Sequence, residues 1–146
     1  PMFALNATKA QPQGIRVGGY HYFRYCSPAL PQARHFSVVL AQTPTDLPPA
    51  LDVERDRCRL DRAQLLQRVQ TFMTEVEKAT GKAVVLYVYP DLEAELQLRR
   101  EFPHNPQWVR SLGRRPPGNW WLWQRSDRGT VAGIAGRVDL NVMREP

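Results

Sequence analysis

Two carboxylates stand two residues apart in the segment Leu51-Asp52-Val53-Glu54. Because alternate residues of a strand point to the same face, a strand here would place Asp52 and Glu54 side by side, about 6 to 7 Å apart. Repulsion between two such groups raises the pKa of one, so that it stays protonated near neutral pH while the other ionises. Hydrolysis of a glycosidic bond requires this division between an acid and its partner.

Taken alone, a D-x-E triplet is a weak signal. Asp52 and Glu54 also fit exposed acids of a loop, or partners of nearby arginines in ion pairs. A further acidic strand favours the catalytic interpretation. Residues 136–141 form an apolar segment that carries Asp139 near the end of the chain. A carboxylate in such a strand is costly unless it is paired or functional.

Aromatic and polar side chains also fall at the ends of expected strands. They are Tyr20, Tyr22, Arg24, Tyr87, Trp123 and Gln124. The flat C–H faces of sugar rings stack on aromatic side chains, and Gln or Arg can bind sugar hydroxyls. Core packing is the other explanation for any single aromatic residue, and we expect it to apply to at least one tryptophan of 120–123.

The strongest helical pattern covers residues 61–82. Its apolar residues recur every three or four positions and form one stripe. Asp61 is placed to cap the first turn together with Gln64, and Gly81 to end the helix in the left-handed conformation. The apolar, β-branched run 83–89 that follows is typical of a strand buried on both faces.

Helices and strands alternate over most of the chain. We expect helices over 3–10, 32–42 and 92–100, and strands over 15–23, 50–54, 108–112, 119–124 and 136–143. This order predicts an α/β fold with parallel strands and right-handed crossovers, followed by strands that have no helices between them. With 146 residues, 42% of them hydrophobic and 23% charged, the chain is expected to form one domain, 1–146.

The net charge of +6 favours an anionic partner, such as a nucleic acid, an anionic membrane or an anionic cell-wall polymer. A basic surface without a special partner is the alternative. The sequence contains no helix-turn-helix, RRM or zinc signature, so we do not expect nucleic acid as a partner. No apolar run reaches the roughly 20 residues of a membrane span. Metal-ligand spacing and phosphate-binding loops are also lacking, so we expect no cofactor.

Four ordered segments resemble the glycoside hydrolase family 25 lysozymes, also called N-acetylmuramidases. They are Gly18-Gly19-Tyr20-His21-Tyr22-Phe23-Arg24, then 47–54, then Trp121-Leu122-Trp123-Gln124 with 126–129, and finally 136–141. The resemblance implies a modified, flattened TIM-like (β/α)5β3 barrel. It also implies hydrolysis of the β-1,4 bond between N-acetylmuramic acid and N-acetylglucosamine, with the glycan strands of peptidoglycan as the partner.

The resemblance also implies roles for individual residues. Glu54 would be the general acid, Asp52 would assist the 2-acetamido group of the substrate, and Asp139 would be a third acidic residue of the pocket. The substrate-binding residues would be Tyr20, Tyr22, Arg24, Tyr87, Trp123 and Gln124. Two carboxylates on one side suit substrate-assisted cleavage, in which the N-acetyl carbonyl is the nucleophile.

The sequence departs from the family pattern at its beginning. The opening strand of the family, which carries an Asp-x-Ser motif, and the strand after it have no counterpart here. We therefore expect an N-terminally incomplete barrel that needs a further N-terminal segment for activity. That segment could be a separate fragment of the same protein and thus a partner of this chain.

Cys26 and Cys58 do not fit a zinc site or a CxxC redox pair. Two buried thiols would be usual in a cytosolic chain, and one disulfide in an exported chain. Each cysteine follows an expected strand of the lysozyme-like core, so parallel pairing of these strands would bring both to one rim. We therefore expect a disulfide, and a secreted or periplasmic protein.

Two other functions remain open at this point. The first is a catalytically impaired module that binds peptidoglycan through its aromatic residues and basic surface. The second is a nucleic-acid binder, which rests on charge alone.

Overall fold

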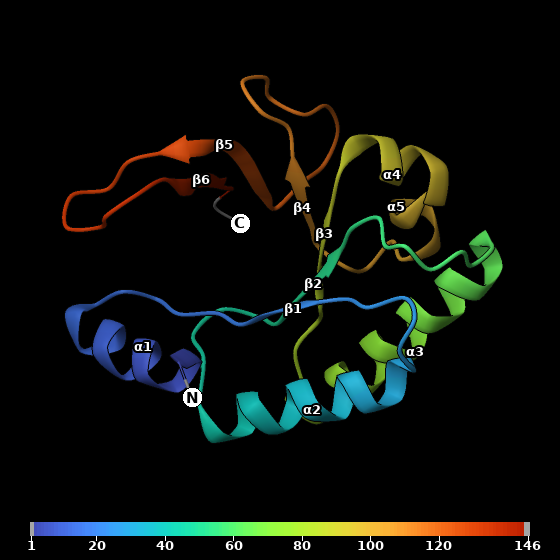
Figure 1. Ribbon diagram of the computed structural model, residues 1–146, viewed down its shortest axis with the longest axis horizontal. Helices are drawn as coiled ribbons and strands as arrows, with labels where there is room; N and C mark the ends of the chain where they lie inside the picture. The colour runs from blue at the N-terminus through green and yellow to red at the C-terminus, as the bar shows by residue number, and fades with distance from the viewer. Residues whose placement is uncertain (1, 145–146) are drawn as a thin grey trace. The chain divides into compact units, whose positions relative to one another are not determined.

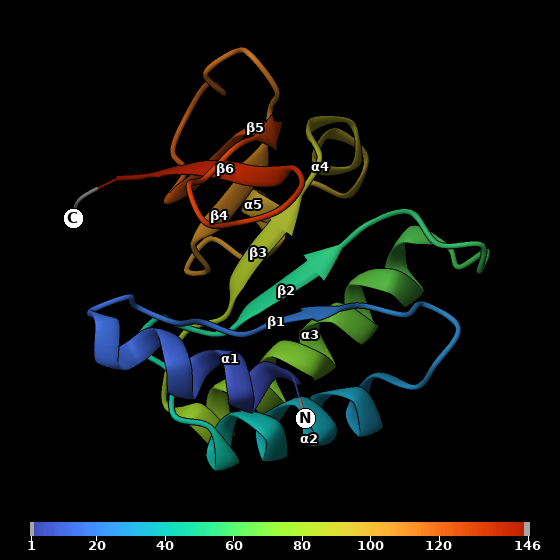
Figure 2. The same cartoon turned by 60° about the vertical axis from the view of Figure 1, so that its left-hand side comes forward.

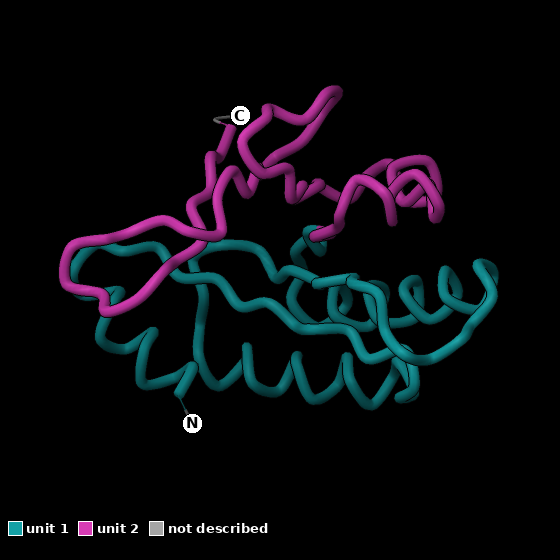
Figure 3. The backbone as a smooth tube through the Cα atoms, turned by 45° about the horizontal axis from the view of Figure 1, so that its top comes forward, with its two compact units in different colours: residues 1–85 teal, residues 86–146 magenta. Residues whose placement is uncertain are grey.

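The computed structural model describes residues 2–144, and the chain divides into two compact units, residues 1–85 and 86–146 (Figure 3). We call them unit 1 and unit 2. The expected single domain 1–146 remains a prediction. Among residues 2–144, no helix combines the length and apolar character needed to cross a bilayer.

Unit 1 contains two parallel strands and three helices. Its elements are α1 (Met2–Ala10), the 3-10 turn η1 (Gln11–Gln13), β1 (Tyr20–Tyr22), α2 (Ala29–Gln42), β2 (Ala50–Val53) and α3 (Arg62–Thr80). In the register of β1 and β2, Tyr22 lies opposite Asp52. Helices α2 and α3 pack together, and Figures 1 and 2 show both on the same side of the two strands.

An aromatic cluster joins the strands of unit 1 to its helices. The ring of His21 in β1 lies 5.6 Å from Phe36 of α2 and 5.0 Å from Phe72 of α3, and Phe23 lies 5.7 Å from Phe72. Leu51 of β2 is fully buried. Burying each large apolar side chain contributes about 1.5 to 3 kcal/mol. The alternation of β1 and β2 therefore assigns odd-numbered residues to the core and leaves Tyr20, Tyr22 and Asp52 on the other face.

Gly19 is required by the same packing. A Cβ atom at this position would lie 2.8 Å from Cδ2 of Leu40 in α2 and 3.3 Å from Cζ of Phe3 in α1. A side chain at Gly19 would therefore displace the end of the Leu40 side chain and press on the Phe3 ring. Gly18 faces a loop instead, where an added Cβ atom would lie 2.9 Å from Cβ of Leu47.

Helix α3 begins and ends as its sequence predicts. The Asp61 side chain accepts a hydrogen bond from the Gln64 backbone N–H at 2.8 Å, and the Gln64 side chain accepts one from Asp61 N–H at 3.2 Å. Gly81 has a φ of 67° and donates to Glu77 O, which ends the helix. The apolar stripe is buried, and it includes Leu65, Val69, Phe72, Met73 and Val76.

Unit 2 contains parallel strands followed by an antiparallel one. After β3 (Val85–Val88), which begins at the last residue of unit 1, come α4 (Pro90–Leu96), α5 (Leu98–Glu101), β4 (Gln107–Arg110), β5 (Leu122–Gly129) and β6 (Val138–Met143). The pairs β3–β4 and β4–β5 are parallel, whereas β5–β6 is antiparallel with two register irregularities. The α/β class is confirmed, as are the terminal strands without helices between them.

Several boundaries differ from the sequence prediction. The helix expected over 92–100 is two helices, because Gln97 adopts a left-handed φ of 55° and its N–H closes α4 on Glu93 O. The strand expected over 15–23 is only Tyr20–Tyr22. Before it, Val17 N–H donates to the Asp46 carboxylate at 2.9 Å and Val17 O accepts from Asp46 N–H at 2.8 Å. The segment before β1 is thus bonded to the loop that contains Asp46 and not to a neighbouring strand. The alternation of apolar and polar side chains in the sequence does not reveal such a contact.

A disulfide joins Cys26 and Cys58, whose Cα atoms lie 5.3 Å apart. It links the loop after β1 to the loop after β2, as the sequence led us to expect. The cross-link spans 32 positions of sequence, so it restricts the unfolded chain considerably.

Replacing both cysteines by serine should lower the free energy of unfolding by about 2 to 4 kcal/mol, because the unfolded chain regains the entropy of the open loop. Urea unfolding of the double variant and the oxidised wild type measures this difference. Equal unfolding midpoints and slopes would show that the disulfide does not stabilise unit 1.

Candidate active site

The two carboxylates expected to act together lie at the carboxyl end of β2. Asp52 is the third residue of the strand, and Glu54 directly follows its last residue. The Asp52 residue is only 9% exposed, and its Oδ1 atom is buried without a hydrogen-bond partner among residues 2–144. Tyr22 lies opposite Asp52 in the register, on the same face. The strand thus holds a carboxyl group away from water at the edge of its sheet.

Burial, and secondarily the charge of Glu54, raises the pKa of Asp52 to about 7. Desolvation disfavours the ionised carboxylate, and a second carboxylate on the same side of the strand adds repulsion. Asp52 therefore holds a proton in about half of the molecules at neutral pH. A carboxylate pair that retains one proton can both donate and accept protons, which is what glycosidic hydrolysis requires.

A further acidic residue, Asp56, organises the rim of this site. Asp56 accepts hydrogen bonds from the backbone N–H groups of Tyr25 at 3.0 Å and Arg57 at 2.6 Å, and it lies 3.5 Å from Nε of Arg24. Burial alone would raise the pKa of Asp56, but these hydrogen bonds and the Arg24 charge hold it below its usual value. Asp56 therefore fixes Arg24 beside the carboxyl end of β1. The sequence analysis did not identify Asp56.

The two tyrosines of β1 lie on the face of Asp52. Tyr20 is 64% exposed and Tyr22 is 42% exposed, whereas His21 between them faces the helices. Partial burial, then the nearby charges of Glu54, Asp56 and Asp52, raises the pKa of Tyr22. The Tyr22 hydroxyl is therefore a neutral hydrogen-bonding group over the whole physiological range.

Unit 2 brings together a polar and aromatic cluster of its own. The Tyr87 hydroxyl donates to Oε1 of Gln124 at 2.6 Å, and both residues are buried. The Trp108 ring lies 5.0 Å from that of Tyr87. Trp108 Nε1 in turn donates to Oδ1 of Asn141 at 2.8 Å. Strand register explains the grouping, because Gln124 of β5 pairs with Asn141 of β6. Tyr87 and Gln124 were expected in the site from the sequence. Trp108 was missed, although it lies two residues before Arg110 and therefore on the same face of β4.

Arg110 extends this cluster toward the carboxyl ends of the strands. Its guanidinium forms an ion pair with Asp127 at 2.9 Å and lies 5.1 Å from the centre of the Tyr89 ring. Asp127 lies in β5 and Tyr89 directly follows β3, so both partners of Arg110 come from other strands of unit 2 or from their ends. No motif in the sequence marks this pair, since it depends on strand register.

The structure does not bring Trp123 to the face of its neighbour Gln124. Trp123 pairs with Val109 and Val142, its ring lies 5.9 Å from that of Trp120, and its Nε1 donates to Ser111 O at 2.7 Å. Neighbouring residues of a strand point to opposite faces, which explains the separation. Trp120, 4% exposed, is the tryptophan that packs in a core.

Asp139 lies in β6, two residues before Asn141, and it is exposed. Its proposed role as a third acid stays a prediction. Among residues 2–144, no three His, Cys, Asp or Glu side chains are grouped so that they could hold a metal ion.

The chain is similar to known proteins over nearly its whole length. The family model for Glycosyl hydrolases family 25 matches residues 1–134. The chain belongs to this family. It is 38% identical over 146 residues to the uncharacterized protein YegX of Escherichia coli (strain K12), covering 97% of this chain and 53% of YegX. It is 28% identical to the autolytic lysozyme of Clostridium acetobutylicum, covering 93% of this chain and 42% of that protein.

A solved structure supports the same assignment. The crystal structure of the Clostridium perfringens spore cortex lytic enzyme SleM superposes with a TM-score of 0.86 at 26% identity. The match covers 97% of this chain and 54% of SleM. The TIM-like family 25 fold is thereby confirmed. The chain spans about half the length of the curated relatives it matches.

The pKa of Asp52 has a consequence for the stability of this family 25 chain. Between pH 4 and 7, an unfolded Asp52 with an ordinary pKa of 3.8 has lost its proton, while the folded chain keeps it. The folded state then binds more protons, so stability falls as pH rises through this window, by up to about 4 kcal/mol.

In Asp52→Asn this loss should be absent, so that the variant gains stability relative to wild type as pH rises from 4 to 7. Chemical unfolding at both pH values measures the change, with Asp91→Asn as the control for an exposed aspartate. A constant difference between Asp52→Asn and wild type at the two pH values would contradict the raised pKa.

Proposed function

We propose that this family 25 domain hydrolyses the β-1,4 bond between N-acetylmuramic acid and N-acetylglucosamine in peptidoglycan. The observation that carries the proposal is the carboxyl pair at the end of β2, in which buried Asp52 has its pKa raised to about 7 beside Glu54. Similarity to an autolytic lysozyme and to a spore cortex lytic enzyme supports this substrate class.

Glu54 protonates the glycosidic oxygen as the bond to C1 of the muramic acid unit breaks. The carbonyl oxygen of the substrate's own 2-acetamido group attacks C1, and Asp52 accepts a hydrogen bond from the acetamido N–H, which increases the nucleophilicity of the carbonyl. Water then attacks C1, the bond between C1 and the acetamido oxygen breaks, and the water gives its proton to Glu54, which restores the enzyme. Two inversions at C1 retain the anomeric configuration.

Binding of substrate changes the surroundings of Asp52. Without substrate, burial keeps a proton on Asp52 for much of the time. A substrate N–H that donates to Asp52 favours the ionised form of this carboxylate. Glu54 is only partly buried, so it can reach the leaving oxygen. In this proposal, ionised Asp52 then stabilises the acetamido group.

Sugar binding is proposed for the aromatic and polar groups of both units. Tyr20 and Tyr22 offer exposed rings, and Arg24 is held by Asp56. Tyr87 and Gln124 offer a buried hydrogen-bonded pair. The disulfide is typical of proteins outside the cytoplasm, which supports a secreted or periplasmic location, where peptidoglycan lies.

Glu54→Gln should lower the rate of peptidoglycan cleavage by at least about a hundredfold, because the amide cannot protonate the leaving oxygen. Release of reducing sugar ends measures the rate, and the anomeric form of the first product should be retained. Glu75→Gln, which removes a long ion pair between α3 and Arg34 of α2, is the matched control and should keep the wild-type rate.

Equal rates in Glu54→Gln and wild type, or an inverted first product, would contradict this mechanism. The second candidate is a peptidoglycan-binding module without turnover, which the net charge of +6 and the exposed tyrosines favour. Sedimentation of wild-type protein with peptidoglycan, without any release of sugar ends even when a polypeptide carrying the N-terminal strands of the family is added, would support that module instead.

A further inference from the structure

Unit 2 contains a cavity at the edge of its sheet where β4 and β5 begin. Its volume is about 520 Å³, and Arg99, residues 102–107, residues 119–121 and Arg144 line it. The carboxyl ends of the same strands carry the Arg110–Asp127 pair, so the cavity opens at the other edge of the unit 2 sheet. None of the residues proposed above for catalysis lines it.

The cavity contains polar atoms that lack partners. Gln107 is only 5% exposed, and its Oε1 has no hydrogen-bond partner among residues 2–144. Its Nε2 donates to Asn105 O at 3.3 Å, which fixes the orientation of the amide. The Nε of Arg99 is also buried without a partner in the described part of the chain. A buried donor and a buried acceptor left unpaired are destabilising, so a ligand that satisfies both would bind favourably.

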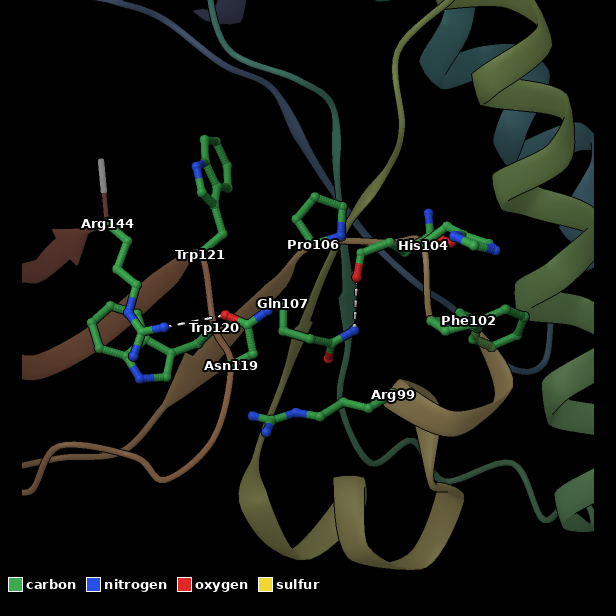
Figure 4. Close-up of a pocket in the computed structure, with 11 residues that line it drawn as sticks. Arg99, Phe102, His104, Pro106, Gln107, Asn119, Trp120, Trp121 and Arg144 are labelled. Carbon is green, nitrogen blue, oxygen red and sulfur yellow. Dashed lines mark hydrogen bonds between the residues drawn. The ribbon is translucent and has the colours of Figure 1, made fainter. Parts of the chain in front are cut away.

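The charge and shape of the cavity indicate what that ligand is. Arg99 and Arg144 line it, and no carboxylate of residues 2–144 does. The Arg144 guanidinium lies 4.3 Å from the centre of the Trp120 ring and donates to Oδ1 of Asn119 at 3.2 Å. Figure 4 shows Gln107 at the centre of the lining residues and the Trp121 indole extending away from Trp120. The cavity thus offers cations for an anion, an acceptor for a hydroxyl or amide, and an indole for a ring.

We propose that this cavity binds a carboxylate-bearing amino sugar, as a second glycan site of the domain. The carboxylate would meet Arg99 and Arg144, an N–H or O–H of the sugar would donate to Gln107, and the sugar face would lie on Trp121. The choice of a wall sugar rests on the proposed function. The site itself rests on the unpaired atoms and on the charge of the cavity. A second site would hold one stretch of glycan while another is cleaved.

The probe is N-acetylmuramic acid, added to wild-type protein while the indole N–H signals are followed by NMR. The Trp121 signal, assigned with Trp121→Phe, should shift in a saturable way. N-acetylglucosamine, which lacks the carboxylate, and lactate, which lacks the sugar, should each bind at least about tenfold more weakly.

Arg144→Gln should weaken the same binding at least about tenfold, whereas Arg114→Gln, an exposed arginine outside the cavity, should leave it unchanged. Glu54→Gln should also leave it unchanged, so the result does not depend on turnover and separates this site from the proposed catalytic one. Lack of a saturable Trp121 shift, equal binding of N-acetylglucosamine, or wild-type binding by a folded Arg144→Gln variant would overturn the proposal.

Discussion

The parallel pairing of β1 and β2 against α2 and α3 is the constraint on which the candidate active site depends. His21, Phe23 and Leu51 face the helices and form the core of unit 1. Alternation then forces Tyr22 and Asp52 onto the opposite face. A slip of one residue in β1 would turn Tyr22 toward the helices, and a slip in β2 would bury the Asp52 carboxylate in the aromatic cluster. The apolar packing of unit 1 therefore determines where its acids lie.

The same arrangement accounts for the chemistry. A carboxyl group that is 9% exposed and has an oxygen without a partner retains its proton to about pH 7. Keeping Asp52 in this state lowers the free energy of unfolding of the chain at neutral pH. Local loss of stability of this kind is common where a protein must hold a reactive group. The capped helix α3 and the disulfide between Cys26 and Cys58 lie in the same unit and offset it.

Much of this could be predicted from the sequence, because the signals were local. The capping box of Asp61 and Gln64, the left-handed Gly81 and the D-x-E alternation are all encoded within a few residues. The resemblance to family 25 added the barrel fold, and the expected parallel pairing of the strands before Cys26 and Cys58 added the disulfide. Pairing between distant residues could not be predicted. Asp56 as the partner of Arg24 and the ion pair of Arg110 with Asp127 depend on register and loop geometry. The face that the Trp123 ring occupies could not be predicted either, because an aromatic cluster at a strand end does not show which face each ring occupies.

The most direct test of the central claim is the titration of the Asp52 carboxyl carbon by 13C NMR, with the signal assigned by its loss in Asp52→Asn. We predict that Asp52 loses its proton near pH 7, where burial and the charge of Glu54 place its pKa. A carboxyl that titrates near its ordinary pKa of 3.8 would contradict the account, because Asp52 would then hold no proton at neutral pH.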